Sequence, residues 1–287
     1  MLGRMASFVT GRDHWLTREG LLRNVVRQEV VRRQLEVHLP LADAGTTALD
    51  VGAGQGTQAL HLARAGFAVT AVEPDPEMRA AFQAALAQER PAVRRRVHLV
   101  AGSLEDLDTL GELGALGSDE GTYDVVCCHG VLMYLPDPNP AIRALGRRVA
   151  VDGILSVVAR NSAAMAWRPA MRGDYAGAHA LLDEVDRAAR ERRDPFYDNE
   201  LGVKARADSL ERLGAFFGGS RVAVEYWYGV RTFSDSVPVD TPVPESADEL
   251  EEIIALETRL GRTDPYRRMG TLLHLVGRRG EGRGPQL

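Results

Sequence analysis

The stretch TALDVGAGQGT, residues 47–57, decides the fold of this chain. Apolar residues flank Asp50 as in a buried strand, and glycines follow at alternate positions, Gly52, Gly54 and Gly56. Residues without a Cβ let the backbone approach a ligand closely, and the helix that follows directs its N-terminus toward that ligand. The stretch therefore predicts a nucleotide-binding turn between a strand and a helix.

The spacing of the glycines narrows the class of ligand that the turn is expected to bind. A dinucleotide fingerprint would place its third small residue at position 57, which is Thr57 here, so the pattern G-x-G-x-G favours a ligand without a pyrophosphate. Glu73 ends the next predicted strand, where a carboxylate can accept hydrogen bonds from both hydroxyls of a ribose. Asp50 lies inside an apolar strand, where an acid is costly unless it has a partner such as a ligand ammonium.

Short strands and helices alternate on both sides of this turn, which predicts an α/β fold with a Rossmann-like, mostly parallel sheet covered on both faces. Two late strands around a helix complete a seven-stranded sheet. The expected strands are residues 46–51, 67–73, 97–102, 123–132, 154–161, 222–233 and 270–279, and the expected helices are 58–65, 76–88, 140–150, 207–217 and 246–260.

The pattern divides the chain into five parts. Residues 1–45 form an N-terminal helical segment, with helical spacing from Leu16 to Leu39 and one or two helices. Residues 46–162 form the core. Residues 163–206 form a helical insertion after the fifth strand, interpreted as two helices with a loop at 191–202 and as a candidate substrate lid. Residues 207–278 complete the sheet, and 279–287 form a disordered tail.

Composition limits the partners. The formal net charge of −5 gives no general attraction for polyanions, so a nucleic acid would need a local basic surface.

Cys127 and Cys128 are adjacent in an apolar strand and should point to opposite faces as buried thiols, without a disulfide. Neither the cysteines nor the histidines have the spacing of a metal site, so no metal is expected. Without a signal peptide or membrane span, we expect a cytoplasmic protein with no membrane contact; the oligomeric state is open.

Five segments together resemble the successive motifs of class I S-adenosylmethionine (SAM) methyltransferases. They occur in the order of that family over residues 48–161, as ALDVGAGQGT, AVEPDPEM, VAGSLEDL, YDVVCCHGVLMYLPD and VDGILSVVARN. The resemblance implies SAM as cofactor and a methyltransferase activity.

The same resemblance implies which residues bind SAM. The methionine part lies on the glycine turn, the ribose at Glu73 and the adenine beside Gly102 and Ser103, with Glu105 as the alternative acid near the adenine amino group. His129 faces the cofactor or the substrate and is a candidate for both cofactor binding and catalysis, although a histidine satisfied by the backbone is equally open. The implied cofactor residues are Arg23, Asp50, Gly52, Ala53, Gly54, Gly56, Glu73, Gly102, Ser103 and His129.

The ends of the chain are similar to the bacterial tRNA 5-carboxymethoxyuridine methyltransferase family, in the segments GLLR (20–23), NSAAMAWRPAMRGDY (161–175), GVRTF (229–233) and ALETRLGRTDPYRRMGTLLHLV (255–276). That family esterifies the carboxylate of a modified uridine, and an arginine matching Arg23 meets the methionine carboxylate of SAM.

A carboxylate nucleophile needs a cation rather than a general base, and arginine is its natural bidentate partner. Candidate catalytic residues are His129, Arg231, Arg259 and Tyr266, and further candidates are Arg160, Arg172 and Tyr175. Tyr134 either offers its ring face to the sulfonium of SAM or is simply packed.

Two alternatives stay open. The first is a small-molecule O- or N-methyltransferase, because the insertion is longer than expected for the tRNA enzyme and the chain is acidic. The second is a nicotinamide-dependent oxidoreductase or a non-catalytic nucleotide-binding module, against which the glycine spacing argues.

Overall fold

The computed structural model describes residues 20–43, 45–110, 121–199 and 202–280. Seven strands form one sheet in the order β3-β2-β1-β4-β5-β9-β8. Their bounds are Thr47–Val51 (β1), Ala68–Glu73 (β2), Val97–Ala101 (β3), Tyr123–His129 (β4), Val149–Arg160 (β5), Val222–Val230 (β8) and Leu272–Arg279 (β9). Strands β1 to β5 are parallel, and β9 runs antiparallel between β5 and β8. The predicted α/β fold with a seven-stranded, mostly parallel sheet is confirmed.

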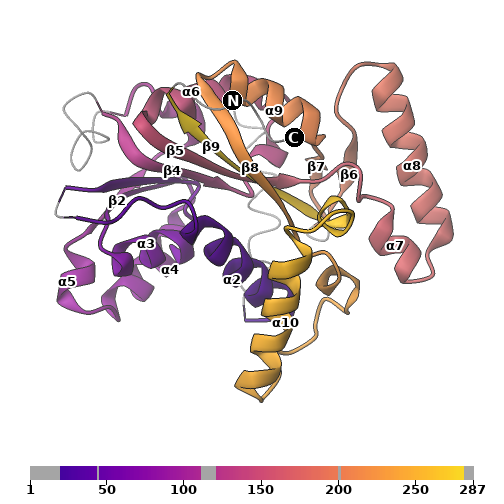
Figure 1. Ribbon diagram of the computed structural model, residues 1–287, viewed down its shortest axis with the longest axis horizontal. Coiled ribbons are helices and arrows are strands. Elements are labelled where there is room, and N and C mark those ends of the chain that lie inside the picture. The colour runs from indigo at the N-terminus through magenta and orange to yellow at the C-terminus, as the bar shows by residue number, and fades with distance from the viewer. Residues whose placement is uncertain (1–19, 44, 111–120, 200–201, 281–287) are drawn as a thin grey trace.

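Helices cover both faces of the sheet (Figure 1). The helices α2, α3, α4 and α5 lie on one side, and α6 and α9 lie on the other. Their bounds are Leu22–Glu36 (α2), Thr57–Ala65 (α3), Pro76–Ala87 (α4), Pro91–Arg94 (α5), Asn139–Arg148 (α6) and Leu210–Gly218 (α9). Helix α4 begins where the sequence indicates, because the Asp75 side chain accepts hydrogen bonds from the backbone N–H groups of Glu77 and Met78.

Two hydrophobic clusters fill the two faces, and the adjacent cysteines belong to different ones. Cys128 packs in the cluster that includes Leu145 of α6 and Phe217 of α9, whereas Cys127 packs in the one that includes Phe82 of α4. Both thiols are free and fully buried, and burial raises their pKa values. They are structural thiols on opposite faces, as the strand period predicts.

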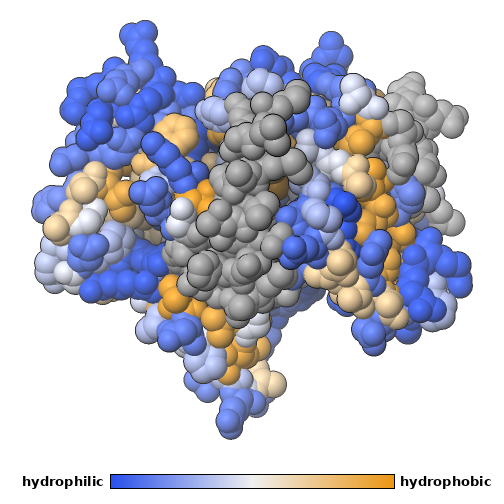
Figure 2. All heavy atoms as spheres, turned by 180° about the vertical axis from the view of Figure 1, so that it is seen from behind, coloured by the Kyte–Doolittle hydropathy of each residue, from blue (hydrophilic) through white to orange (hydrophobic). Residues whose placement is uncertain are grey.

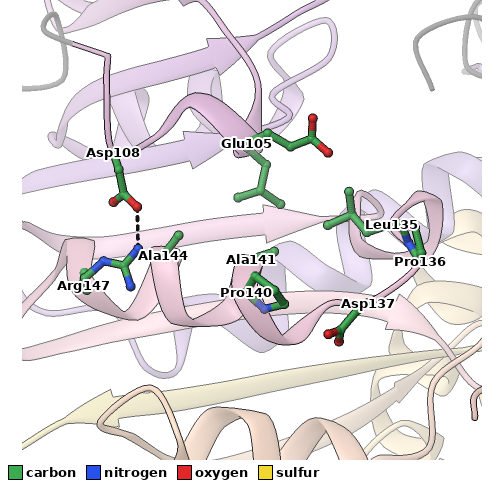
Figure 3. Close-up of a pocket in the computed structure, with 10 residues that line it drawn as sticks. Glu105, Asp108, Leu135, Pro136, Asp137, Pro140, Ala141, Ala144 and Arg147 are labelled. Atoms are coloured by element: carbon green, nitrogen blue, oxygen red, sulfur yellow. Dashed lines mark hydrogen bonds and ion pairs between the residues drawn. The ribbon is translucent and has the colours of Figure 1, made fainter. Parts of the chain in front are cut away.

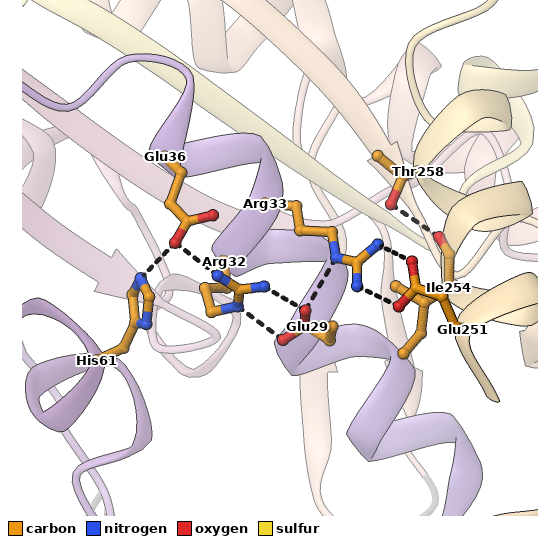
Figure 4. A network of polar contacts seen from close by, with 8 residues as sticks. All are labelled: Glu29, Arg32, Arg33, Glu36, His61, Glu251, Ile254 and Thr258. Atoms are coloured by element: carbon orange, nitrogen blue, oxygen red, sulfur yellow. Dashed lines mark hydrogen bonds and ion pairs between the residues drawn. The ribbon is translucent and has the colours of Figure 1, made fainter. Parts of the chain in front are cut away.

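Helix α2 is the described part of the predicted N-terminal helical segment, and residues 16–19 lie outside the described residues. Its buried face, with Val26 and Val30, packs against Val158 of β5, Val230 of β8 and Ile254 of α10 (Ala247–Leu260). Its outer face carries a network of polar contacts to α3 and α10 (Figure 4): His61 of α3 lies 3.2 Å from Glu36, and the Arg33 guanidinium meets both carboxylate oxygens of Glu251. The helix is thereby held on two sides.

The insertion differs from its prediction. It contains the expected helices, α7 (Trp167–Met171) and α8 (Tyr175–Arg190), but the expected loop at 191–202 is wrong. An antiparallel hairpin of β6 (Phe196–Asp198) and β7 (Lys204–Arg206) stands there instead. The Asn199 side chain accepts from the Val203 backbone N–H, and Gly202 has a φ of +70°, so these turn residues close the hairpin.

A buried arginine ties this hairpin to the core. Arg206 is fully buried and donates to Asp208 at 2.7 Å and to the backbone carbonyl of Leu135. Asp194 lies 3.5 Å from the same guanidinium. The backbone carbonyl of Asp208 accepts from the Ser162 N–H, so the end of the insertion is fastened beside its beginning.

The boundaries of the five predicted parts stay predictions, and the tail at 281–287 lies outside the described residues. No helix within the described residues is long and apolar enough to cross a membrane. Seen from behind, hydrophilic residues cover most of the described surface and hydrophobic residues form separate patches (Figure 2). Most apolar side chains therefore lie in the core.

We expect Arg206→Met to destabilise the protein by about 3–5 kcal/mol, because it leaves the buried carboxylate of Asp208 without its partner. Urea unfolding followed by circular dichroism measures the change. The control is Arg64→Met, which removes a surface ion pair with Glu89 and should cost less than about 1 kcal/mol. Equal losses in the two variants would contradict the anchoring role of Arg206.

Candidate active site

The glycine turn has the geometry that the sequence predicts. Gly52, Gly54 and Gly56 all have positive φ values, of +73°, +57° and +90°. A Cβ on Gly52 would lie 2.3 Å from Val131, and one on Gly56 would lie 2.3 Å from the Phe82 ring. A Cβ on Gly54 would meet no atom within 4 Å, so this residue borders open space. Only glycine fits the first and third positions, and the second leaves the backbone accessible to a ligand.

Glu73 braces this turn. Its carboxylate accepts hydrogen bonds from the Gly54 N–H at 2.8 Å and from the Asp75 N–H at 2.9 Å. Burial raises the pKa of Glu73, and these two hydrogen bonds partly offset the rise. The predicted ribose-binding carboxylate therefore also holds the backbone of the turn in place.

Asp50 is the neighbouring acid, and it is 2% exposed. Its Oδ2 atom is buried and has no hydrogen-bond partner among the described residues. Burial and the nearby charge of Glu73 raise the pKa of Asp50 to about 7. Because a buried carboxylate without a partner is costly, this oxygen fits a cationic ligand group such as the methionine ammonium of SAM.

The residues predicted beside the adenine lie at the end of β3. A Cβ on Gly102 would lie 2.7 Å from Leu110. The Ser103 hydroxyl donates to Asp106 at 2.7 Å and accepts from the Glu105 N–H, which caps the short 3-10 helix η1 (Leu104–Asp106). The adenine roles of Gly102 and Ser103 stay predictions, as does the contact of Ala53 with the methionine part.

His129 ends β4 with its Nε2 atom 2.8 Å from the Ser156 hydroxyl. Burial and the charge of Arg27 lower the pKa of His129 to about 3. The ring is thus neutral near pH 7 and is a weak base. Its predicted contact with cofactor or substrate stays a prediction, and the low pKa argues against a general base at this position.

Arg23 and Arg231 meet at one carboxylate. The Asp235 Oδ1 atom accepts from the Arg23 Nη2 atom at 2.7 Å and from Arg231. Asp235 is fully buried, and burial alone would raise its pKa. The charges of the arginines, of which Arg231 has the largest effect, instead hold the pKa of Asp235 well below its usual range. Burial lowers the pKa of Arg231 to about 10. Arg231 also has a φ of +59°, a strained conformation for an arginine.

The charges of three more guanidinium groups, those of Arg160, Arg168 and Arg172, interact with the same carboxylate. We call these five residues, Arg23, Arg160, Arg168, Arg172 and Arg231, the arginine cluster. Burial lowers the pKa of Arg168 to about 9. The Nε atoms of Arg160 and Arg231 are buried without a hydrogen-bond partner among the described residues. Among the described residues, positive charge therefore exceeds negative charge here, and two donors are available to an anion.

The hairpin of the insertion contacts the arginine cluster and the segment after β4. The Arg160 guanidinium lies 5.1 Å from the centre of the Tyr197 ring, and the Tyr134 hydroxyl hydrogen bonds with the Asn199 side chain. Tyr134, Tyr197 and Asn199 thus connect the end of β4 with the insertion. The contact between Tyr134 and a sulfonium stays a prediction.

Other predicted residues do not join the cluster. Arg259 is exposed on α10, Tyr266 is 47% exposed in a 3-10 turn (η5, Tyr266–Met269), and Tyr175 is 69% exposed at the start of α8. A resemblance in the surrounding segment suggested Arg259 and Tyr266, but the helix face and turn that carry them point to solvent.

Sequence reasoning missed Asp235, Arg168, Tyr197 and Asn199. An acid four residues after Arg231 is the only local signal for Asp235. The hairpin residues stand in a segment interpreted as a loop, so nothing in their spacing indicated that they face a strand end.

A cleft of about 430 Å³ lies between η1 and α6. Figure 3 shows Glu105 and Asp108 on one side of it and Arg147 of α6 opposite, paired with Asp108 at 2.5 Å. Neither the glycine turn nor the arginine cluster lines this cleft, so it is separate from both. Over the described ranges, no group of three or more histidine, cysteine or acidic side chains could hold a metal.

A family model described as a methyltransferase domain matches residues 49–155, which include the glycine turn, Glu73 and His129. The chain carries a SAM-dependent methyltransferase domain. Its fold agrees with the crystal structure of magnesium protoporphyrin IX methyltransferase from Synechocystis PCC 6803 with bound S-adenosylhomocysteine (SAH). That structure is 18% identical, with a TM-score of 0.58 over 96% of this chain and 98% of that one.

Curated relatives of the methyltransferase domain are named ubiquinone biosynthesis O-methyltransferase. The protein of Pseudomonas paraeruginosa (strain DSM 24068 / PA7) is 30% identical over 171 residues, 58% of this chain and 66% of that protein. The protein of Xanthomonas euvesicatoria pv. vesicatoria (strain 85-10) is 33% identical over 145 residues, 50% of this chain and 53% of that protein. The chain thus spans between about half and two thirds of the length of these relatives.

We expect SAH affinity to weaken as the pH falls below about 7, because a protonated Asp50 cannot attract the ligand ammonium. The dissociation constant should approach a tenfold rise per pH unit in the acidic range and level off above pH 7. Calorimetry from pH 5.5 to 8.5 measures it. Asp50→Asn should bind weakly at every pH without this slope, and an unchanged slope in that variant would refute the role of Asp50.

Proposed function

We propose that this protein transfers the methyl group of SAM to an oxygen atom of a small molecule that carries an anionic group. The observation that carries the proposal is the arginine cluster, in which two guanidinium groups contact Asp235 and the charges of three more interact with it. Guanidinium groups bind carboxylates and phosphates through paired, charge-assisted hydrogen bonds. The unpartnered Nε atoms of Arg160 and Arg231 supply donors for such an anion.

The cluster suits an acceptor that approaches the cofactor from the β5 and β8 side. Methyl transfer is an in-line displacement, so holding both reactants in line accounts for much of the rate, with about 7–11 kcal/mol available from orientation. In this proposal the cofactor lies on the glycine turn and the arginines hold the acceptor. On that side the ring of the hairpin residue Tyr197 lies against the Arg160 guanidinium.

The tRNA acceptor is the other candidate, and the same arginines would suit the carboxylate of 5-carboxymethoxyuridine. The relatives above support a small molecule, because their names describe O-methylation in ubiquinone biosynthesis. The net charge of −5 also favours a small acceptor over a polyanion. We therefore place the small-molecule acceptor first.

Incubation with methyl-labelled SAM tests the acceptor class. One reaction contains the low-molecular-weight fraction of a bacterial extract, and the other contains bulk tRNA from a strain that lacks the modified uridine ester. We expect label in the small-molecule fraction. Label in the tRNA alone would replace the small-molecule acceptor with the tRNA acceptor, and label in neither reaction would refute both proposals.

We expect Arg160→Met to lower kcat/KM for the labelled acceptor by about 10- to 100-fold, mainly through KM, because a charge-assisted hydrogen bond contributes about 1.5–3 kcal/mol. SAH affinity, measured by calorimetry, should not change. The control Arg187→Met removes an exposed arginine of α8 and should leave kcat/KM unchanged. Equal kinetics in the two variants would contradict the anion site.

A further inference from the structure

A line of polar side chains crosses the apolar layer between the sheet and α2. His129 of β4 and the Ser156 hydroxyl of β5 are 2.8 Å apart, and the same hydroxyl lies 2.9 Å from the His274 Nε2 atom of β9. The His274 Nδ1 atom lies 2.8 Å from the Gln34 Oε1 atom of α2. Ser156 and His274 are fully buried, and Gln34 is 2% exposed. We call Gln34, His274, Ser156 and His129 the polar relay.

The far end of the relay determines the orientation of Gln34. The Gln34 amide nitrogen lies 3.1 Å from the backbone carbonyl of Gly229. A carbonyl oxygen only accepts hydrogen bonds, so the amide NH₂ must face it and the amide oxygen must face His274. The His274 Nδ1 atom therefore carries a hydrogen and donates to Gln34.

The direction of the remaining hydrogen bonds follows from the charge of His274. The ring is fully buried and its centroid lies 5.7 Å from that of His129, and burial together with the charges of His129 and His38 lowers its pKa well below the ordinary value. A neutral ring protonated at Nδ1 has a lone pair at Nε2, which accepts from the Ser156 hydroxyl. The serine oxygen then accepts from His129, whose Nε2 atom must carry the hydrogen.

We infer that the polar relay holds His129 in its Nε2–H form, so that the Nδ1 lone pair serves as a hydrogen-bond acceptor for a protonated group of a ligand at the end of β4. The inference rests on the proposed function. No described residue hydrogen bonds with Nδ1, and the ring is only partly buried. Gln34, Ser156 and His274 are positioning residues. The donor is an ammonium of the cofactor or a hydroxyl of the methyl acceptor.

The group that lies against the Nδ1 atom of His129 belongs either to the cofactor or to the methyl acceptor. An ammonium on the Nδ1 side holds the cofactor, whereas a hydroxyl there is an acceptor group distinct from the anion held by the arginines. A carboxylate is not expected against Nδ1, because two lone pairs would face each other. The guanidinium of Arg27, whose charge acts on His129, disfavours a second proton on the ring.

Long-range ¹H–¹⁵N NMR spectra of the full chain labelled with ¹⁵N-histidine test the relay without reference to methyl transfer. We expect His129 to be protonated at Nε2 and His274 at Nδ1 at pH 7, with assignments from His129→Asn and His274→Asn. In Ser156→Ala, His129 should show both forms. A wild-type His129 protonated at Nδ1, or a cationic His274, would overturn the inference even if the protein is a methyltransferase.

The variant Gln34→Glu should reverse the relay, because a carboxylate beside His274 stabilises protons on both of its nitrogens and turns the serine toward His129. His129 would then carry its hydrogen at Nδ1. If the ligand donor is the cofactor ammonium, the dissociation constant for SAH rises about tenfold; if the donor belongs to the acceptor, SAH binding is unchanged and kcat/KM falls about tenfold.

Gln28→Glu is the matched control. It adds the same charge to the same helix at a half-buried position outside the relay, and it should change neither quantity. Thermal denaturation of both variants separates loss of folding from loss of the relay. A reversed His129 in Gln34→Glu with unchanged SAH affinity and unchanged kcat/KM would overturn the proposed ligand contact.

Discussion

The ion pair between Arg23 and Asp235 holds together the edge of the sheet where the site lies. Its partners are 212 residues apart, on α2 and on the loop after β8, and both are buried. Glu257 of α10, also buried, accepts from three successive backbone N–H groups, those of residues 232–234, and so holds the same loop. Three elements from the two ends of the chain thereby meet above the carboxyl ends of the strands.

Negative and positive side chains lie on different sides of this edge of the sheet. The glycine-turn side carries the buried acids Asp50 and Glu73, whereas the side of β5 and β8 carries the arginine cluster. SAM is a cation at its sulfonium and at its ammonium, so acids beside the glycine turn, where we propose that it binds, suit this methyl donor. An excess of guanidinium groups suits an anionic acceptor. In the proposed function, the field of the site thus directs each reactant to its own half and keeps their orientation fixed.

Local patterns predicted some features fully. Gly52 and Gly56 could be recognised because no other residue fits their positive φ values and close neighbours. The opposite faces of Cys127 and Cys128 follow from the strand period alone. The hairpin after α8 was wrong, because three-residue strands are too short for a periodic pattern, and their pairing depends on Arg206 reaching Asp208 and the core.

The sequence by itself determined the alternation of strands and helices in the core, the seven-stranded sheet, the glycine turn and the acids beside it, since each depends on residues close together in the chain. Only the tertiary structure decided that Arg23, Arg160 and Arg231 gather around Asp235 while Arg259 faces solvent. It also decided that Gln34 of α2 and His274 of β9 come within hydrogen-bond distance in the layer between the helix and the sheet. Two of these contacts, Arg23 with Asp235 and Gln34 with His274, join residues more than two hundred positions apart, and their distances depend on how helices and strands pack, which local spacing does not contain.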